Sequence, residues 1–212
     1  MVDYSLYLVT DRSLSRGRTS VDIVAAAVDG GVTCVQLREK NCDTREFVAE
    51  ARALKPLLAD RQIPLIINDR LDVALAVGAD GVHLGQRDMA IGDARRIVGN
   101  SMLIGISAES AADAVQAEKD GADYIGISPV FATRTKADTA PPLGLAGISE
   151  IRCCVDIPLV GIGGIDHTNA ASVMTAGVDG IAVVSAIVSA DDPAAAAQQL
   201  LMIIDENVPQ RR

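Results

Sequence analysis

Hydroxyl and cationic side chains alternate in one short segment of the chain, formed by Thr133, Arg134, Thr135 and Lys136. An apolar run from Tyr124 to Ile127 comes before this segment, and Pro141-Pro142 comes after it. Lysine neutralises phosphate charge, and threonine hydroxyls and loop amides donate hydrogen bonds to phosphate oxygens. A long loop inside a compact domain is usually functional. By its spacing alone the segment fits either a phosphate-binding loop or a solvated surface loop.

A second polar segment, QLREK, lies further upstream and consists of Gln36, Leu37, Arg38, Glu39 and Lys40. Residues two apart in an extended chain point to the same side. Gln36, Arg38 and Lys40 are therefore expected to face one site as hydrogen-bond donors, with Glu39 on the opposite side. A ligand-binding strand end is favoured over an ordinary end with solvated charges.

Two acidic residues, Asp69 and Asp88, each follow an apolar run. Carboxylates that lie close together repel each other unless a cation sits between them or one is protonated. Mg²⁺ prefers oxygen ligands and commonly keeps substrate phosphate in its shell. Each acid also has a simpler explanation, because Asp69 precedes a helix expected from Arg70 and Asp88 one expected near Ala90. Metal binding and helix capping both remain open at this point.

Eight apolar runs are expected to be strands. Four of them share a pattern in which a glycine opens the segment, at residues 31–37, 78–84, 121–127 and 177–183, and four more occupy residues 6–10, 65–68, 103–107 and 159–162. Nearly continuous apolar runs are typical of parallel strands that are buried on both faces. Helical patterns separate them, so the sequence predicts an α/β fold, a (β/α)8 TIM barrel in one compact domain over residues 1–212. A doubly wound open sheet is the alternative.

The expected helices carry recognisable start signals. Asp43 and Glu46 have the spacing of a capping box, and Pro56 is expected to kink that helix or end its regular part. Asp166 is expected to cap a later helix.

Polar and small residues gather after the expected strands, where barrels carry their chemistry. Besides the two segments and the two acids, this set comprises Asn68, Ser107, Gly163, Gly164 and Ser185. Glycines after strand 7 and a serine after strand 8 occupy positions where many barrels hold phosphate. His83 and His167 lack a nucleophile or metal-ligand partner at recognisable spacing, so both are assigned structural roles.

The composition excludes several classes of protein. The 212 residues carry a formal net charge of −9, which argues against a nucleic-acid partner. Aromatic residues make up only 2%, so the core must consist of branched aliphatic side chains. The N-terminus lacks the pattern of a signal peptide, and no apolar run approaches the roughly 20 residues that span a bilayer. We therefore expect a cytoplasmic protein without membrane contact, with reduced cysteines, small-molecule substrates and a possible homodimer.

The chain resembles the thiamine phosphate synthase family along nearly all its length. The matching stretches are YLVTD (7–11), QLREK (36–40), INDRLDVALAVGADGVHLGQRDM (67–89), GADYIGISPVFATRTK (121–136), APPLGL (140–145) and VGIGGI (160–165). The resemblance implies a (β/α)8 barrel and a magnesium-dependent transferase. In that reaction an aminopyrimidine methyl diphosphate loses diphosphate, and the nitrogen of hydroxyethylthiazole phosphate or carboxythiazole phosphate captures the methylene group. The products are thiamine phosphate and diphosphate.

The resemblance also implies roles for individual residues. Arg38, Lys40 and Lys136 would stabilise the departing diphosphate, and Asp69 and Asp88 would hold magnesium. The substrate-binding set would be Gln36, Leu37, Arg38, Glu39, Lys40, Asn68, Ser107, Thr133, Arg134, Thr135, Lys136, Gly163, Gly164, Val184 and Ser185. The loop would close over both substrates and exclude water. The chain departs from many family members at Glu109, where they have a histidine.

Three rival functions remain possible. A thiazole tautomerase resembles the synthase but transfers a proton and does not need the metal pair, whereas this chain has both acids and both cationic segments. Another phosphate-handling barrel, such as an isomerase, would need a general base. A sensor that binds phosphate ligands without catalysis would show no metal-dependent turnover.

Overall fold

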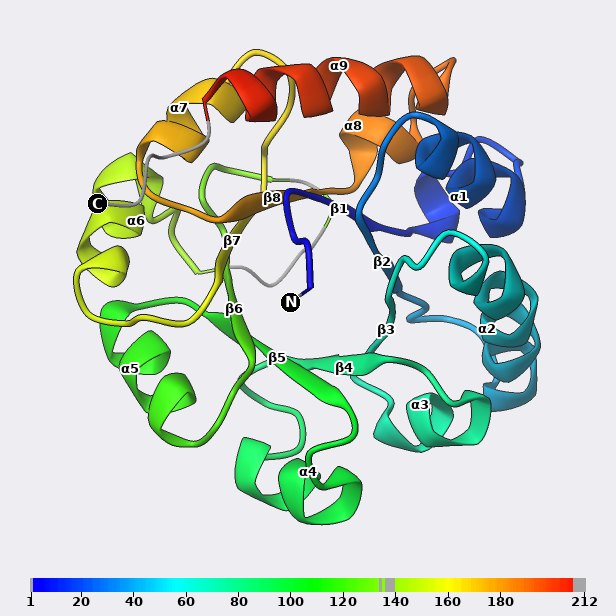
Figure 1. Ribbon diagram of the computed structural model, residues 1–212, viewed down its shortest axis with the longest axis horizontal. Coiled ribbons are helices and arrows are strands. Elements are labelled where there is room, and N and C mark those ends of the chain that lie inside the picture. Colours follow the sequence, from blue (N-terminus) through cyan, green and yellow to red (C-terminus); the bar gives the residue numbers. More distant parts are fainter. Residues whose placement is uncertain (1, 134, 136–139, 208–212) are drawn as a thin grey trace.

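Eight short parallel strands form a closed barrel (Figure 1). The computed structural model describes residues 2–133, 135 and 140–207. The strands are β1 (Leu6–Val9), β2 (Cys34–Leu37), β3 (Leu65–Asn68), β4 (Gly81–Leu84), β5 (Leu103–Ala108), β6 (Tyr124–Ile127), β7 (Leu159–Ile162) and β8 (Gly180–Val183). Each pairs with its sequence neighbours, and β1 closes the barrel on β8. The predicted (β/α)8 barrel is therefore confirmed, and the open-sheet alternative is wrong.

Helices surround the barrel as an outer ring (Figure 1). They are η1 (Arg12–Leu14), α1 (Ser20–Asp29), α2 (Thr44–Ala59), α3 (Leu71–Val77), α4 (Ile91–Val98), α5 (Ala111–Lys119), α6 (Gly144–Arg152), α7 (Ala170–Thr175), α8 (Ser185–Val188) and α9 (Pro193–Glu206). A parallel strand can reach its neighbour only through a crossover, which places a helix between consecutive strands.

The side chains of the strands divide the core into two parts. One large cluster fills the space between strands and helices and consists mainly of Val, Ile, Leu and Ala. A smaller cluster fills the inside of the barrel and contains Tyr4, Tyr7, Cys34, Ile66, Tyr124, Val160 and Ala182. All three tyrosines of the chain lie in this inner cluster. The tyrosines are thus concentrated inside the barrel, whereas Phe47 and Phe131 belong to the outer cluster.

The helix starts agree only in part with the sequence signals. Asp43 caps α2 as predicted, since its carboxylate accepts from the backbone N–H of Glu46. Pro56 does not end α2, which continues to Ala59. Asp166 does not cap α7, because Asn169 stands at that position and the Asp166 carboxylate accepts from Thr168 instead.

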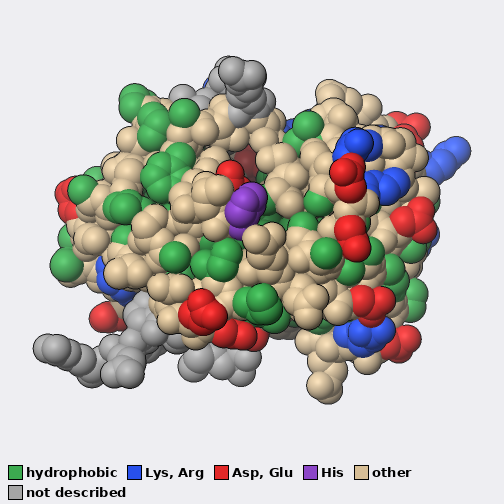
Figure 2. Space-filling view, turned by 90° about the horizontal axis from the view of Figure 1, so that it is seen from above, with side chains coloured by type: hydrophobic (Ala, Val, Ile, Leu, Met, Phe, Trp, Pro, Cys, Tyr) green, Lys and Arg blue, Asp and Glu red, His purple; other side chains and the backbone are tan. Residues whose placement is uncertain are grey.

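The outer surface is mixed in character. The flank that carries α7, α8 and α9 shows hydrophobic side chains scattered among polar atoms, with charges of both signs at its α1 end (Figure 2). Within residues 2–133, 135 and 140–207, no helix is long and apolar enough to cross a membrane. The four cysteines are free thiols.

Candidate functional site

A cavity of about 440 Å³ opens at the carboxyl ends of the strands. Thirteen of the residues predicted from the sequence line it: Gln36, Arg38, Lys40, Asn68, Asp69, Asp88, Ser107, Thr133, Thr135, Gly163, Gly164, Val184 and Ser185. They lie in or after seven different strands of the barrel, so only closure of the sheet brings them together. Glu109 also lines the cavity.

The remaining predicted residues are placed differently. Leu37 is fully buried in the outer core, and the Glu39 side chain lies against Arg12, so the structure places both outside the cavity lining. The alternation expected for the QLREK segment explains this result, because Leu37 and Glu39 have the opposite parity to Gln36, Arg38 and Lys40. Their side chains thus lie outside the cavity lining, and their assignment to substrate binding stays a prediction. Arg134 and Lys136 lie outside the described residues.

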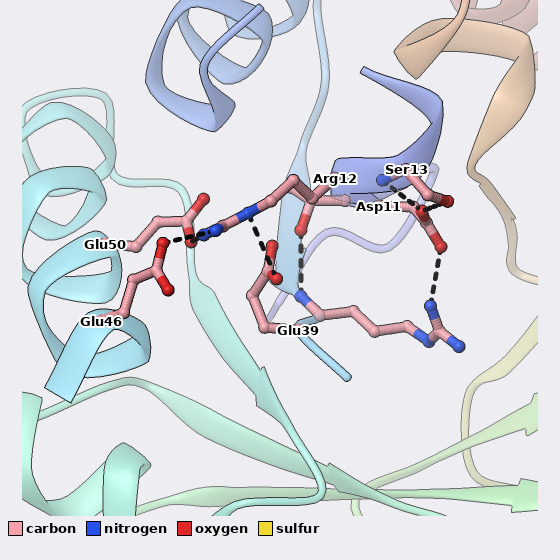
Figure 3. Close-up of polar contacts among 8 residues, drawn as sticks. Asp11, Arg12, Ser13, Glu39, Glu46 and Glu50 are labelled. Carbon is pink, nitrogen blue, oxygen red and sulfur yellow. Dashed lines mark hydrogen bonds and ion pairs between the residues drawn. The ribbon is translucent and has the colours of Figure 1, made fainter. Parts of the chain in front are cut away.

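Asp11 holds the guanidinium of Arg38 at the end of β2. Arg38 Nη1 donates to Asp11 Oδ2 at 2.8 Å, and the other oxygen of Asp11 accepts from the backbone N–H of Ser13 at 3.0 Å (Figure 3). The backbone N–H of Arg38 also donates to Thr10 Oγ1 at 3.0 Å. Both the main chain and the side chain of Arg38 are thus anchored to the segment that follows β1.

A second ionic cluster lies beside Asp11. Arg12 contacts Glu39 at 3.4 Å, Glu46 at 2.5 Å and Glu50 at 2.7 Å, which ties the end of β2 to α2 (Figure 3). The Glu39 side chain is only 4% exposed, and its buried Oε1 atom has no hydrogen-bond partner in the described part of the chain. Burial raises the pKa of Glu39, and repulsion from Glu50 raises this pKa further.

The two candidate metal ligands lie close together with a cation beside them. Lys40 Nζ pairs with Asp69 Oδ2, and the backbone N–H of Gly85 donates to Asp88 Oδ2 at 2.7 Å. Burial raises the pKa of Asp88, and the neighbouring Asp69 carboxylate adds to the rise. The capping alternatives are wrong for both acids: α3 and α4 start after Arg70 and Ala90, without a side-chain cap. Asp69 instead adopts a left-handed turn with φ 60°.

This acid pair suits a divalent cation. Two hard carboxylates that repel each other would gain from a cation between them, and Mg²⁺ takes such ligands. Among residues 2–133, 135 and 140–207, no group of three or more His, Cys, Asp or Glu side chains is placed to hold a metal. The pair would therefore leave further coordination positions to water and to phosphate oxygens of a ligand.

The floor of the cavity is polar. Asn68 Nδ2 is a buried donor that has no hydrogen-bond partner among the described residues. An unpaired buried donor is costly, and an acceptor on a bound ligand would satisfy it. Tyr7, His83 and Tyr124 also line the floor and were not predicted as site residues. The side chains of Tyr7 and Tyr124 point from their strands into the barrel interior. His83 was predicted to be structural, but its ring also contacts Ser107 in the cavity.

The loop after β6 packs directly against the glycines after β7. The backbone N–H groups of Val130 and Phe131 donate to the carbonyls of Ile162 and Gly163 at 2.9 and 3.0 Å. Gly164 has φ 66°, and a Cβ there would lie 2.7 Å from the Ala132 carbonyl oxygen. Glycine is needed at this position both for its left-handed backbone and for this approach. The packing brings Thr133 and Thr135 to the same side of the cavity as Gly164.

Comparison with known proteins gives consistent results. The family model described as thiamine monophosphate synthase matches residues 6–187. Proteins named thiamine-phosphate synthase from Chloroflexus aurantiacus and Albidiferax ferrireducens are 55% and 56% identical to this chain over 96% and 94% of its length, which correspond to 94% and 91% of their own. A solved structure of thiamine phosphate pyrophosphorylase from Pyrococcus furiosus superposes with a TM-score of 0.91 at 42% identity and covers 98% of both chains.

Proposed function

Because the chain belongs to the thiamine monophosphate synthase family, we propose that it joins an aminopyrimidine methyl diphosphate to a thiazole phosphate. The bond between the pyrimidine methylene carbon and the diphosphate oxygen breaks, and its electron pair leaves with the diphosphate. The lone pair of the thiazole nitrogen then forms the new carbon–nitrogen bond. Thiamine phosphate and diphosphate are the products.

One observation carries this proposal: the cavity lining combines two cationic side chains with a separate group of glycines and threonines. Arg38 and Lys40 provide fixed positive charge on one side. On the other side, Gly164 and the two threonines offer backbone N–H groups and hydroxyls. A condensation of two phosphorylated molecules needs both sides, whereas an isomerase of one sugar phosphate needs only one side together with a general base.

The cationic side would act on the departing diphosphate. Charge grows on that group as the carbon–oxygen bond breaks, and cations already held in place stabilise it without reorganisation. Asp11 keeps Arg38 in position, and the resemblance adds Lys136 to this side. Asp69 and Asp88 would hold Mg²⁺, which when bound would neutralise diphosphate charge and so improve the leaving group.

The remaining residues would bind and orient the two rings. Gln36, Asn68 and Ser107 lie on the floor, where the aminopyrimidine would bind. Thr133, Thr135, Gly163, Gly164, Val184 and Ser185 would bind the thiazole phosphate. Holding the nitrogen close to the methylene carbon turns the capture into an intramolecular step.

The direct test is product formation from the pyrimidine diphosphate and hydroxyethylthiazole phosphate, first with Mg²⁺ and then with chelator. We expect thiamine phosphate and diphosphate in equal amounts, only when the metal is present. Conversion between thiazole phosphate isomers without condensation would instead indicate a tautomerase. Binding of both ligands without any turnover would indicate a ligand sensor.

A further inference from the structure

A continuous chain of hydrogen bonds crosses the interior of the barrel beneath the cavity. Gln36 Nε2 donates to Tyr7 Oη at 3.0 Å, and Tyr7 Oη lies 2.9 Å from Tyr124 Oη. Tyr124 Oη lies 3.0 Å from His83 Nδ1, and His83 Nε2 lies 3.0 Å from Ser107 Oγ. The chain joins strands β1, β2, β4, β5 and β6, and its two ends are polar residues of the cavity.

The middle of this chain is held rigidly. Tyr7 is 1% exposed and Tyr124 is fully buried. The ring of Tyr124 packs on Tyr4 with centroids 4.6 Å apart. Gly105 provides the space for that ring, since a Cβ at this position would lie 2.1 Å from Tyr124 Cζ. Well-packed aromatic side chains have few alternative rotamers, so the hydroxyls of both tyrosines have fixed positions.

The chemistry of the end group sets the direction of the chain. An amide nitrogen can only donate, so Tyr7 Oη is the acceptor for Gln36. Tyr7 then donates to Tyr124, Tyr124 donates to His83 Nδ1, and the neutral ring donates through Nε2–H to Ser107. If Tyr124 instead donated to Tyr7, the hydroxyl of Tyr7 could donate only to the neighbouring thiol of Cys34, which is a weak acceptor. Within the part of the chain that the structure describes, this order leaves the O–H of Ser107 and the side-chain oxygen of Gln36 available to a ligand.

We propose that Tyr7, Tyr124 and His83 are positioning residues that fix the hydrogen-bond polarity of the cavity floor. They orient Gln36 so that it presents an acceptor to the ligand and Ser107 so that it presents a donor. This inference rests on the proposed function. A 4-aminopyrimidine carries a donor amino group beside an acceptor ring nitrogen, and the corresponding 4-oxo ring, with its N–H, has the opposite order. The fixed floor would select the amino compound.

The test compares three single-atom deletions from buried tyrosines. Tyr7→Phe and Tyr124→Phe each break the chain, and Tyr4→Phe is the matched control because its ring lies in the same cluster outside the cavity lining. For each variant we would measure KM and kcat with the pyrimidine diphosphate and with the thiazole phosphate. We would also measure inhibition by the 4-amino and the 4-oxo forms of the hydroxymethylpyrimidine monophosphate.

For Tyr7→Phe and Tyr124→Phe we expect KM for the pyrimidine diphosphate to rise about ten-fold, the effect of one misoriented hydrogen bond. The preference for the 4-amino inhibitor over the 4-oxo inhibitor should fall by about the same factor. KM for the thiazole phosphate and all constants of Tyr4→Phe should stay unchanged. If the tyrosines had only a structural role, the kinetic constants of all three variants would change alike and the preference for the 4-amino inhibitor would persist. That result would overturn the proposal.

Failure of the proposed function has a different outcome. If the native protein forms no thiamine phosphate, then the proposed function is wrong whatever the variants do. If it forms product but Tyr7→Phe and Tyr124→Phe keep the inhibitor preference, only the positioning role is wrong.

A second test uses nitrogen-15 NMR spectra of the histidine rings in the native protein, so it does not depend on a variant that breaks the hydrogen-bond chain. The spectrum of His167→Asn would assign the signals of the two histidines. We expect the Nε2–H tautomer at His83, and the Nδ1–H tautomer would contradict the proposed direction.

Discussion

The carboxylate of Asp11 accepts a hydrogen bond from the guanidinium of Arg38 at 2.8 Å, and both side chains are largely buried at the cavity edge. Asp11 follows β1 and Arg38 follows β2, so the contact links neighbouring strand ends. The pair leaves the rest of the guanidinium fork available to a ligand. An arginine held by an acid in this way is oriented before its ligand arrives, which lowers the entropy lost on binding.

Replacing Asp11 by Asn should reduce kcat with the pyrimidine diphosphate about 10- to 100-fold, because Arg38 loses the charge that orients it while diphosphate charge develops. The control is Ser13→Ala, which removes the other side-chain contact of Asp11 without touching Arg38. We expect the control to retain near-native kcat. Equal losses in both variants would show that the turn around η1, and not the orientation of Arg38, is what matters.

Asp69→Asn should raise the Mg²⁺ concentration needed for half-maximal activity at least about ten-fold, because the site loses a negatively charged ligand. Asp72→Asn is a matched control, since Asp72 is exposed on α3 nearby and pairs with Arg70. Magnesium titrations of initial rate would measure both variants. An unaltered titration for Asp69→Asn would remove Asp69 from the metal site.

Gly164→Ala should impair binding of the thiazole phosphate more than that of the pyrimidine diphosphate. The new methyl group would lie 2.7 Å from the Ala132 carbonyl oxygen and push the loop after β6 away from the cavity. Gly78→Ala imposes similar backbone strain at φ 63° with no atom within 4 Å, so it controls for the loss of stability alone. We expect KM for the thiazole phosphate to rise about ten-fold only for Gly164→Ala. A similar rise for both glycine variants would count against the packing argument.

Glu39→Gln should change how stability depends on pH. The pKa of Glu39 is raised in the folded state, so the folded protein binds more protons than the unfolded chain between the ordinary and the raised pKa. Stability of the native protein therefore falls as pH rises through that range, and the variant should lack this contribution. Urea denaturation of both proteins at pH 4, 5, 6 and 7 would measure the difference. Glu150→Gln on α6 is the control. The prediction would be refuted if the difference in unfolding free energy between the native protein and Glu39→Gln were the same at every pH.

The sequence alone determined the barrel and most of the cavity. Apolar runs marked the strands because both faces of a parallel strand are buried, and this pattern is local. Seven of the eight predicted runs contain a whole strand, and the run at residues 103–107 stops one residue short of the end of β5. The runs at residues 65–68 and 159–162 match their strands residue for residue. Chemistry in a barrel lies at strand ends, so polar residues after each run also identified the lining. Alternation within QLREK separated Gln36 and Arg38 from Leu37 and Glu39 for the same local reason.

Only the tertiary structure decided which polar groups contact each other across the barrel. Helix capping was a reasonable local explanation for Asp69 and Asp88, yet the turn at Asp69 and the Gly85 N–H direct both acids to the cavity. The chain through Tyr7, Tyr124 and His83 joins residues far apart in sequence, and Gly105 provides the space it needs. Such contacts depend on strand register and on barrel closure, which no local pattern encodes. For that reason the sequence identified the lining residues, while the orientation of their hydrogen bonds required the fold.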